Sequence, residues 1–375
     1  MSNISHIILY VFLFFVFYSF ILKKQNYINK NYIYVVIIPI LIYSLVVGMR
    51  YGWGPDYLWY KFRFEHPLDY EDEDLGFRLF NMFIAKLGFN HVGVFISYSL
   101  VFISSGFILL RSYNENKYMI FLFLLATLSF HTTAIRQAFA HSFVFLYIYY
   151  LNKQKWLYLI PCVFFQISIH GATILTTFYI TAFYFFTKKP LNCKYVIILY
   201  ILLSLFSIQL SGFVSSYITD IVTSLGFIDN KFSGYIDNSD RWFGSDAIDE
   251  ERIQSTMGFI MSVLYYSSSI YIGAIALKYK PKFSIIYIYN ASVVGFIIFR
   301  LFLLFEILKR IAIPLEMLYF IPTGYAFYFF KYYRKLLSPK EKMYYSASIY
   351  IIVIYYIMYY GRFILLSPER IFIWN

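Results

Sequence analysis

Four residues stand out in this apolar chain because ionisable side chains are rare in hydrophobic segments and usually serve function there. Arg50 and Asp56 follow an apolar run that ends at Gly48, within the stretch MRYGWGPDYLWY. Arg136 lies between two apolar runs, and His170 lies in the turn sequence SIHGAT. Guanidinium groups bind phosphate oxygens bidentately, and a carboxylate or imidazole can take a proton from a hydroxyl. The set indicates sugar transfer from a diphosphate-linked donor.

Most of these residues also have a structural interpretation. Arg50 could be an interfacial arginine that extends to lipid headgroups, and Asp56 could cap the turn after Pro55. A lone histidine such as His170 is more often structural than catalytic. The acidic stretch EDED, residues 71–74, is interpreted as a solvated loop.

A second group of charges follows later in the chain, around two expected helices. Its members are Arg300, Glu306, Lys309, Arg310 and Glu316. Glu306 and Arg310 are four residues apart, a spacing that allows an ion pair on one helix face. The group could equally line the same site as the first four residues.

Composition indicates that these residues belong to a polytopic membrane protein. The chain of 375 residues is 60% hydrophobic and only 14% charged, whereas soluble domains are about a quarter charged. No long polar segment separates two halves, so we expect a single membrane domain over residues 1–375, retained without a cleavable signal.

The net charge of +12 is not interpreted as nucleic-acid binding, because the location of the charges matters more than their total. Cys162 and Cys193 fit no metal or disulfide spacing, and no metal or cofactor is expected.

The apolar runs predict an all-α integral membrane protein with about twelve transmembrane helices. The expected spans are 5–22, 31–49, 91–110, 117–134, 135–152, 156–169, 171–187, 195–217, 256–277, 283–304, 311–330 and 343–360. Lysine-rich loops alternate with net acidic ones. The positive-inside rule then places the lysine-rich loops in the cytoplasm and both termini outside. Two large loops, 50–90 and 218–255, face outward.

Two long apolar stretches, 118–151 and 156–187, must position Arg136 and His170. A single helix over the first would be roughly 50 Å long, which exceeds a hydrocarbon core of about 30 Å. Each stretch is therefore expected to form a hairpin of two short helices. The hairpin tips carry Arg136 and His170 on the outer side, below the membrane surface. Non-helical backbone at that depth must lie against protein or water, so we expect an outward cavity lined by the four residues named first.

The opening stretch also carries a resemblance to a known family. MRYGWGPDYLWYKFRF resembles the first outer-loop motif of the EpsG family of Wzy-type polysaccharide polymerases. The matching positions are Arg50, Gly54, Asp56, Tyr57 and Tyr60.

Later segments extend the resemblance over about residues 30–330. EDEDLGFRLFN resembles the acidic residue and glycine–aromatic pair that follow in the family. AIRQAFAHSFVFLYIYYLNKQKWLYLIPCVFFQISIHGAT is similar to the next block, with Arg136, Lys153, Lys155 and His170 on its marked positions. LKRIAIPLEMLYFIP is similar to the late arginine-containing helix, through Arg310. The chain departs from the family at Pro55, and at Gly171, where serine is common.

The resemblance implies a metal-independent, inverting glycosyltransferase of the integral-membrane type. Such a protein polymerises repeat units linked to undecaprenyl diphosphate into capsule, exopolysaccharide or O-antigen, at the outer face of the bacterial inner membrane. The implied partners are the lipid-linked glycan donor and acceptor, the lipid bilayer, and flippase and chain-length regulator proteins, with no nucleic acid. The expected catalytic residues are Asp56, His170 and Arg136. The expected substrate-binding residues are Arg50, Tyr57, Tyr60 and Arg310.

Two other classes of protein remain open. A flippase or transporter of the lipid-linked unit would also use arginines in a cavity, although transporters often contain internal repeats and none is evident here. A membrane acyltransferase would carry its histidine and arginine at the cytoplasmic end of a helix, whereas His170 is expected outside. Within the polymerase hypothesis, either His170 or Asp56 serves as general base.

Overall fold

The chain is helical, apart from one short pair of strands, over the residues that the structure describes. The computed structural model describes residues 11–13, 15–19, 32–51, 57–66, 74–113, 115–207, 209–210, 256–302, 306–365 and 371–372. Strand β1 (Arg50–Tyr51) pairs antiparallel with strand β2 (Ile371–Phe372). Two compact units form, residues 1–178 with 356–375, and residues 179–355. The predicted outer loop 218–255 lies outside the described residues.

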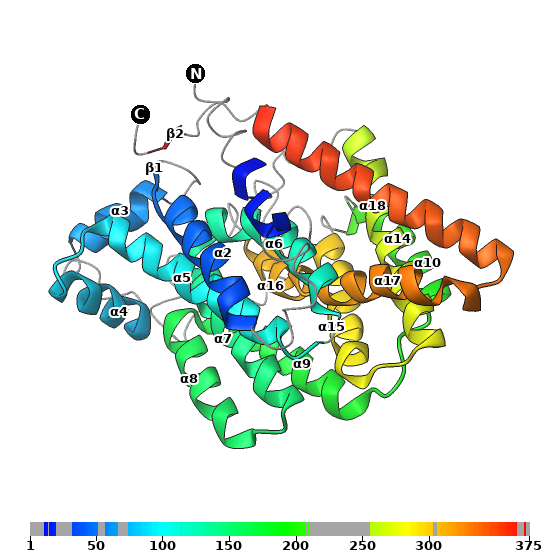
Figure 1. The fold of residues 1–375 in the computed structure, drawn as a ribbon, viewed down its shortest axis with the longest axis horizontal. Coiled ribbons are helices and arrows are strands. Elements are labelled where there is room, and N and C mark those ends of the chain that lie inside the picture. The colour runs from blue at the N-terminus through cyan, green and yellow to red at the C-terminus, as the bar shows by residue number, and fades with distance from the viewer. Residues whose placement is uncertain are drawn as a thin grey trace. The chain divides into compact units, whose positions relative to one another are not determined.

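The first unit is built on α5, against which α2 and α7 pack most extensively, while α7 also packs along α8 (Figure 1). Its helices are α2 (Tyr32–Gly48), α3 (Tyr57–Glu65), α4 (Leu75–Lys86), α5 (His91–Leu110), α6 (Asn116–Thr133), α7 (Ile135–Asn152), α8 (Leu159–Ile169) and the start of α9 (Ile174–Phe186). Two 3-10 turns, η3 (Trp156–Tyr158) and η4 (Gly171–Thr173), precede α8 and α9.

Both helix breaks expected in the long apolar stretches are present. Helix α6 ends at Thr133 and α7 begins at Ile135, so the first break falls at Ala134. Helix α8 ends at Ile169, and η4 leads into α9. The polar residues that interrupt each apolar run therefore coincide with the ends of helices.

The segment 50–90, expected to be a large loop, contains helices. Helices α3 and α4 fall within it, and each buries an apolar face in the first unit. Their buried side chains recur at helical spacing, for example Tyr57, Tyr60 and Phe64 on α3. This periodicity stabilises a helix against the rest of the unit, and it explains why α3 and α4 form where a connecting loop was expected.

The second unit brings together helices from the second half of the chain. They are α10 (Cys193–Leu205), α14 (Thr256–Tyr279), α15 (Phe283–Leu301), α16 (Glu306–Met317), α17 (Phe320–Tyr333), the 3-10 turn η8 (Arg334–Leu336) and most of α18 (Pro339–Leu365). Helix α14 packs against α10 and α17, and α15 packs against α16.

The expected single span 311–330 is wrong, because two helices occupy it. Helix α16 ends at Met317 and α17 begins at Phe320. Pro322 has no N–H to donate to the carbonyl of Leu318, so a continuous helix would lose a hydrogen bond there and clash with the proline ring. Proline is tolerated in the first turn of a helix, and Pro322 lies in the first turn of α17.

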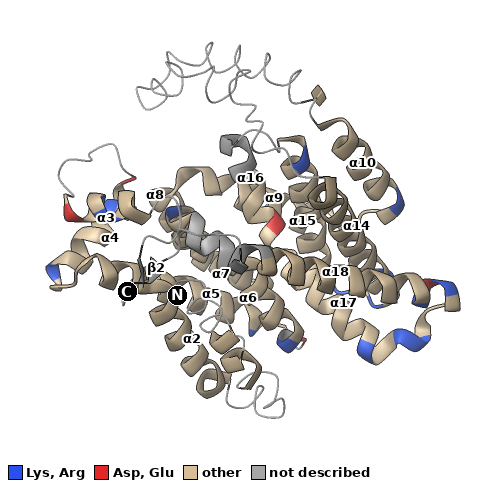
Figure 2. Ribbon diagram, turned by 90° about the horizontal axis from the view of Figure 1, so that it is seen from above, with Lys and Arg blue, Asp and Glu red and all other residues tan. Residues whose placement is uncertain are grey.

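Helix length and composition are those of a membrane protein. Four helical segments among the described residues are long and apolar enough to cross a bilayer: His91–Leu110, Thr256–Tyr279, Phe283–Leu301 and Pro339–Gly361. Shorter apolar helices accompany them, including Tyr32–Gly48, Trp156–Ile169 and Gly171–Phe186. Figure 2 shows that most described helices carry few charges along their length and that lysine and arginine gather near helix ends and turns.

Candidate functional site

A carboxylate, a guanidinium and an imidazole meet in the first unit. Oδ2 of Asp74 lies 3.7 Å from Nη1 of Arg136 and 4.0 Å from Nδ1 of His170. The three residues come from three separate segments: the residue before α4, the first turn of α7 and the residue after α8. One carboxylate oxygen thus faces both the Arg136 guanidinium and the His170 imidazole. These are the two side chains that the sequence places at the helix breaks.

Arg136 is held at the start of α7 by its apolar neighbours. Ile135 and Phe139 are both buried, and they anchor the first turn in the unit's interior. Ala134, the residue before the helix, makes no side-chain cap. A helix N-terminus carries partial positive charge, so a cation there is unfavourable unless an anion is close. Asp74 supplies that anion, and a bound phosphate could do the same.

His170 is fixed by hydrogen bonds that close the break between α8 and α9. Its backbone is extended, with φ −158° and ψ 96°. Its N–H donates to the carbonyl of Gln166 (3.0 Å), and its carbonyl accepts from N–H and Oγ1 of Thr173 (3.1 and 2.6 Å). Buried Gln166 binds the carbonyl of Thr173 and accepts from Oγ1 of Thr177. The imidazole therefore projects from a braced turn.

Asp74 reaches the site because α4 lies very close to the end of α8. A Cβ atom on Gly76 would lie 2.3 Å from Oγ and 2.9 Å from the carbonyl oxygen of Ser168, two residues before His170. Only glycine permits that approach without a shift of one helix. Asp74 is also the N-cap residue of α4, yet its side chain makes no capping hydrogen bond. Its carboxylate is directed at Arg136 and His170 instead.

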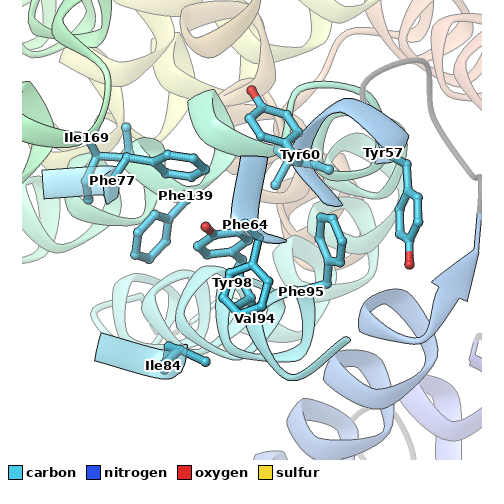
Figure 3. Packing of buried hydrophobic residues seen from close by; sticks show 12 residues of the cluster. Tyr57, Tyr60, Phe64, Phe77, Ile84, Val94, Phe95, Tyr98, Phe139 and Ile169 are labelled. Atoms are coloured by element: carbon cyan, nitrogen blue, oxygen red, sulfur yellow. The ribbon is translucent and has the colours of Figure 1, made fainter. Parts of the chain in front are cut away.

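A buried cluster rich in aromatic residues, here called the aromatic cluster, packs these helices together (Figure 3). It includes Phe77, Tyr98 and Phe139, and also Ile135 and Ile169, which adjoin Arg136 and His170 in the chain. Phe77, next to Gly76, is buried and stacks on Tyr98 of α5 at 5.4 Å between ring centroids. Tyr98 in turn contacts Phe139 of α7 at 4.8 Å. The glycine–aromatic pair thus has two physical roles: Gly76 sets the distance between α4 and α8, and Phe77 anchors α4 in the cluster.

Partial burial makes the three polar residues suited to binding a ligand. The exposed fractions of the Arg136, Asp74 and His170 side chains are 24%, 27% and 20%. Partly buried charges are screened less by salt than surface ones, and the side chains remain accessible. Nε of Arg136 is buried and has no hydrogen-bond partner within the described part of the chain.

Asp74 is the site residue for which the interpretation from sequence was wrong. We expected a solvated acidic loop, and the structure instead pairs this carboxylate with Arg136 and His170. Its signal in the sequence is its place two residues before Gly76, the first residue of the glycine–aromatic pair. Arg136 and His170 were expected to lie near each other, and both contact the same oxygen.

The remaining expected residues divide into two groups. Asp56 and the side chains of Arg50 and Arg310 lie outside what the structure describes. Tyr57 and Tyr60 are buried in the aromatic cluster. The Tyr57 ring stacks on Phe95 at 4.6 Å, and the Tyr60 ring meets Phe77 edge-on at 5.6 Å.

Arg300, from the second group of charges, is buried within the second unit. Its Nε donates to Oγ of Ser204 (2.7 Å) and its Nη2 to Oγ of Ser262 (3.4 Å), which links α15 to α10 and α14. Its guanidinium carbon also lies 4.9 Å from the ring centroid of Phe259. Nearby, the hydroxyl of Tyr266 donates to Glu316 of α16. These contacts give Arg300 a bracing role between helices.

The sequence profile of one protein family, the EpsG family, matches residues 33–370, nearly the whole chain. This range includes Asp74, Arg136 and His170, as well as the second unit. Comparisons with curated proteins and with solved structures found no match.

Proposed function

This chain belongs to the EpsG family, and on that premise we propose that it is a glycosyltransferase that polymerises oligosaccharide repeat units carried on undecaprenyl diphosphate. Family membership supports a role like that of a polysaccharide polymerase. The observation that carries the proposal further is the position of Asp74 Oδ2, which faces both Arg136 and His170. An anion-binding group and a candidate base are thereby brought to one place.

In the proposed reaction, Arg136 binds the diphosphate of the donor. The donor is the growing chain on its lipid carrier, and its reducing-end sugar carbon is the electrophile. The guanidinium fork suits phosphate oxygens, and the N-terminus of α7 adds a favourable dipole. As the bond between that carbon and the diphosphate oxygen breaks, the electron pair leaves with the diphosphate. Arg136 then stabilises the developing charge from a position fixed in advance.

His170 is the proposed general base toward the acceptor. If Nδ1–H of the neutral imidazole points at Asp74, Nε2 is the nitrogen that accepts a proton, as in other carboxylate–histidine pairs. A hydroxyl at the non-reducing end of the second lipid-linked unit attacks the sugar carbon and gives its proton to His170. The separation of 4.0 Å is looser than a hydrogen bond, and such contacts often tighten when substrate binds. Asp56 stays the alternative base, with Arg50 and Arg310 as further proposed phosphate ligands.

We assign Tyr57 and Tyr60 to positioning in this scheme. Their burial and ring contacts support a role in holding α3 against α4 and α5. These tyrosines would then influence substrate binding indirectly, by fixing the positions of α3, α4 and α5.

The membrane arrangement proposed with this function has about twelve crossings, with the site at the outer face of the bacterial inner membrane. Helix α7 has 18 residues and so is roughly 27 Å long. Lys153 and Lys155 follow its C-terminus, at the end of the α7–α8 hairpin remote from Arg136. Lysines at that end favour a cytoplasmic location for it, which would place Arg136 and His170 outward.

A reaction with purified protein tests the proposal. The full chain in lipid nanodiscs is given a lipid-linked repeat unit, and the glycan ladder and released undecaprenyl diphosphate are measured together. We expect both products from the wild type, and we expect His170→Gln to slow both by at least about 100-fold. His91→Gln, at the start of α5, is the matched control and should leave the rate unchanged. Absence of any ladder from folded wild-type protein would count against a polymerase.

A further inference from the structure

Helices α3 and α4 present a second apolar face that is exposed in the described part of the chain. On α4, Leu75, Leu79 and Phe83 recur every four residues, and Leu79 and Phe83 are 53% and 58% exposed. On α3, Leu58 and Phe62 are exposed in the same way. The opposite face of each helix enters the aromatic cluster. A helix that is apolar on both sides is not expected to face water.

The length of α4 excludes a membrane crossing. Its 12 residues extend roughly 18 Å, against a hydrocarbon core of about 30 Å. Helix α5, which follows, is long and apolar enough to cross, and its 20 residues span only about 30 Å. Its first residue, His91, must therefore lie close to the membrane boundary.

The short connection to α5 limits how far the end of α4 can lie from the membrane boundary. Only residues 87–90 separate Lys86 from His91, and five backbone steps reach at most about 18 Å. Two of these connecting residues, Leu87 and Phe89, are apolar and exposed. Exposed apolar residues therefore continue along the chain from α4 to the start of α5.

Helices α3 and α4 also carry basic and aromatic residues of the types that are common at the level of lipid headgroups. The guanidinium carbon of Arg63 lies 3.5 Å from the ring centroid of exposed Trp59 on α3. Lys86 ends α4, and it is exposed. Tryptophan and basic residues are enriched at membrane interfaces, and amphipathic helices with such flanks lie in the interfacial plane.

We propose that α3 and α4 are interfacial helices whose outer faces, formed by Leu58, Phe62, Leu75, Leu79 and Phe83, contact lipid. These two helices then lie in the membrane interface rather than in the aqueous space. Asp74 directly precedes Leu75, the first residue of α4, so the candidate site adjoins this lipid-facing surface. The next step rests on the proposed function. Substrate held by a lipid carrier would reach the Asp74–Arg136–His170 site along the plane of the membrane.

Spin labelling of the full chain in liposomes tests this placement without any assay of activity. Nitroxides are attached to Leu79→Cys and Phe83→Cys in a background carrying Cys162→Ala and Cys193→Ala. Collision rates with oxygen, which partitions into lipid, are compared with those of a water-soluble nickel chelate. Ile354→Cys, exposed on membrane-spanning α18, gives the lipid reference, and Lys335→Cys, exposed on η8, gives the aqueous reference.

The expected result is a shift toward oxygen at both α4 positions, as at Ile354. Preference for the nickel chelate, as at Lys335, would place the face in water and overturn the proposal. Low collision rates with both reagents would also overturn it, because they would indicate cover by protein, such as a second copy of the chain. Reconstituted variants that fail to fold are replaced by Leu75→Cys and Leu58→Cys, which carry the same expectation. Loss of polymerase activity alone would not affect this result.

Discussion

The guanidinium of Arg136 lies 3.7 Å from the carboxylate of Asp74, which ties the first turn of α7 to the residue before α4. Asp74 balances a cation at a helix N-terminus, where positive charge is otherwise unfavourable. The same carboxylate oxygen faces His170. Loss of the Asp74 carboxylate should therefore have different effects on phosphate binding by Arg136 and on proton transfer to His170.

Asp74→Asn should lower the rate of polymerisation by at least about 100-fold, because the carboxylate no longer orients and stabilises the imidazole as it takes a proton. Binding of the donor should stay the same or tighten, since Arg136 loses its competing anion. Steady-state kinetics in nanodiscs separate kcat from KM. Glu65→Gln is the control, because Glu65 pairs with His91 (3.4 Å) in the same unit. An unchanged kcat for Asp74→Asn would remove Asp74 from the mechanism.

Arg136→Lys should fail to restore the wild-type rate although it keeps the charge. A lysine presents one ammonium group in place of a planar fork, so bidentate binding of phosphate is lost. The expected loss is about 100-fold or more in kcat/KM for the donor. Arg111→Lys, at the exposed C-terminal end of α5, is the matched control. Equal kcat/KM values for Arg136→Lys and wild type would show that charge alone suffices.

Gly76→Ala should disrupt the site through packing. The new Cβ would lie 2.3 Å from Oγ of Ser168, so α4 must move away from α8, at a cost of about 1–3 kcal/mol in folding free energy. Asp74 moves with α4, and polymer yield should fall. Gly171→Ser is the control, since a Cβ there meets no atom within 4 Å.

The double variant Gly76→Ala with Ser168→Gly distinguishes steric overlap from other effects. Removing the Ser168 side chain removes the two nearest of the three closest atoms to the new Cβ and leaves the carbonyl oxygen, at 2.9 Å. Partial recovery of both thermal stability and polymer yield is expected. If Gly76→Ala alone is as stable and as active as wild type, the close approach of α4 and α8 is not required.

Arg300→Lys should destabilise the second unit. Lysine cannot reproduce both guanidinium hydrogen bonds to Ser204 and Ser262, and each hydrogen bond to a charged group contributes about 1.5–3 kcal/mol. Thermal unfolding of the purified variant in detergent measures the effect. Arg334→Lys, on the exposed turn η8, should leave the melting temperature unchanged. An unchanged melting temperature for Arg300→Lys would argue against its bracing role.

The helix breaks were predictable because they follow from physical limits that act along the sequence. An apolar stretch longer than the bilayer cannot remain one helix, and polar residues mark where it ends. Arg136 and His170 lie next to these breaks for that reason. The break between α16 and α17 was missed, although Pro322 was a local signal for it.

The role of Asp74 could not be predicted in the same way. It depends on the contact between Gly76 and Ser168, two residues far apart in the chain, and no local pattern encodes that distance. Tyr57 and Tyr60 show the converse. Their match to the EpsG motif implied contact with substrate, whereas their rings pack against Phe95 and Phe77.

The most direct test of the central claim is the size distribution of surface polysaccharide in a strain lacking this protein, complemented with wild type, Arg136→Ala or Arg111→Ala. The account predicts that the deletion strain exports single repeat units and that wild type and Arg111→Ala restore a ladder. Arg136→Ala should leave single units despite normal protein levels. A full ladder from Arg136→Ala would contradict the role of this arginine. Unchanged polymer length after deletion, or repeat units trapped in the cytoplasm, would contradict the polymerase itself.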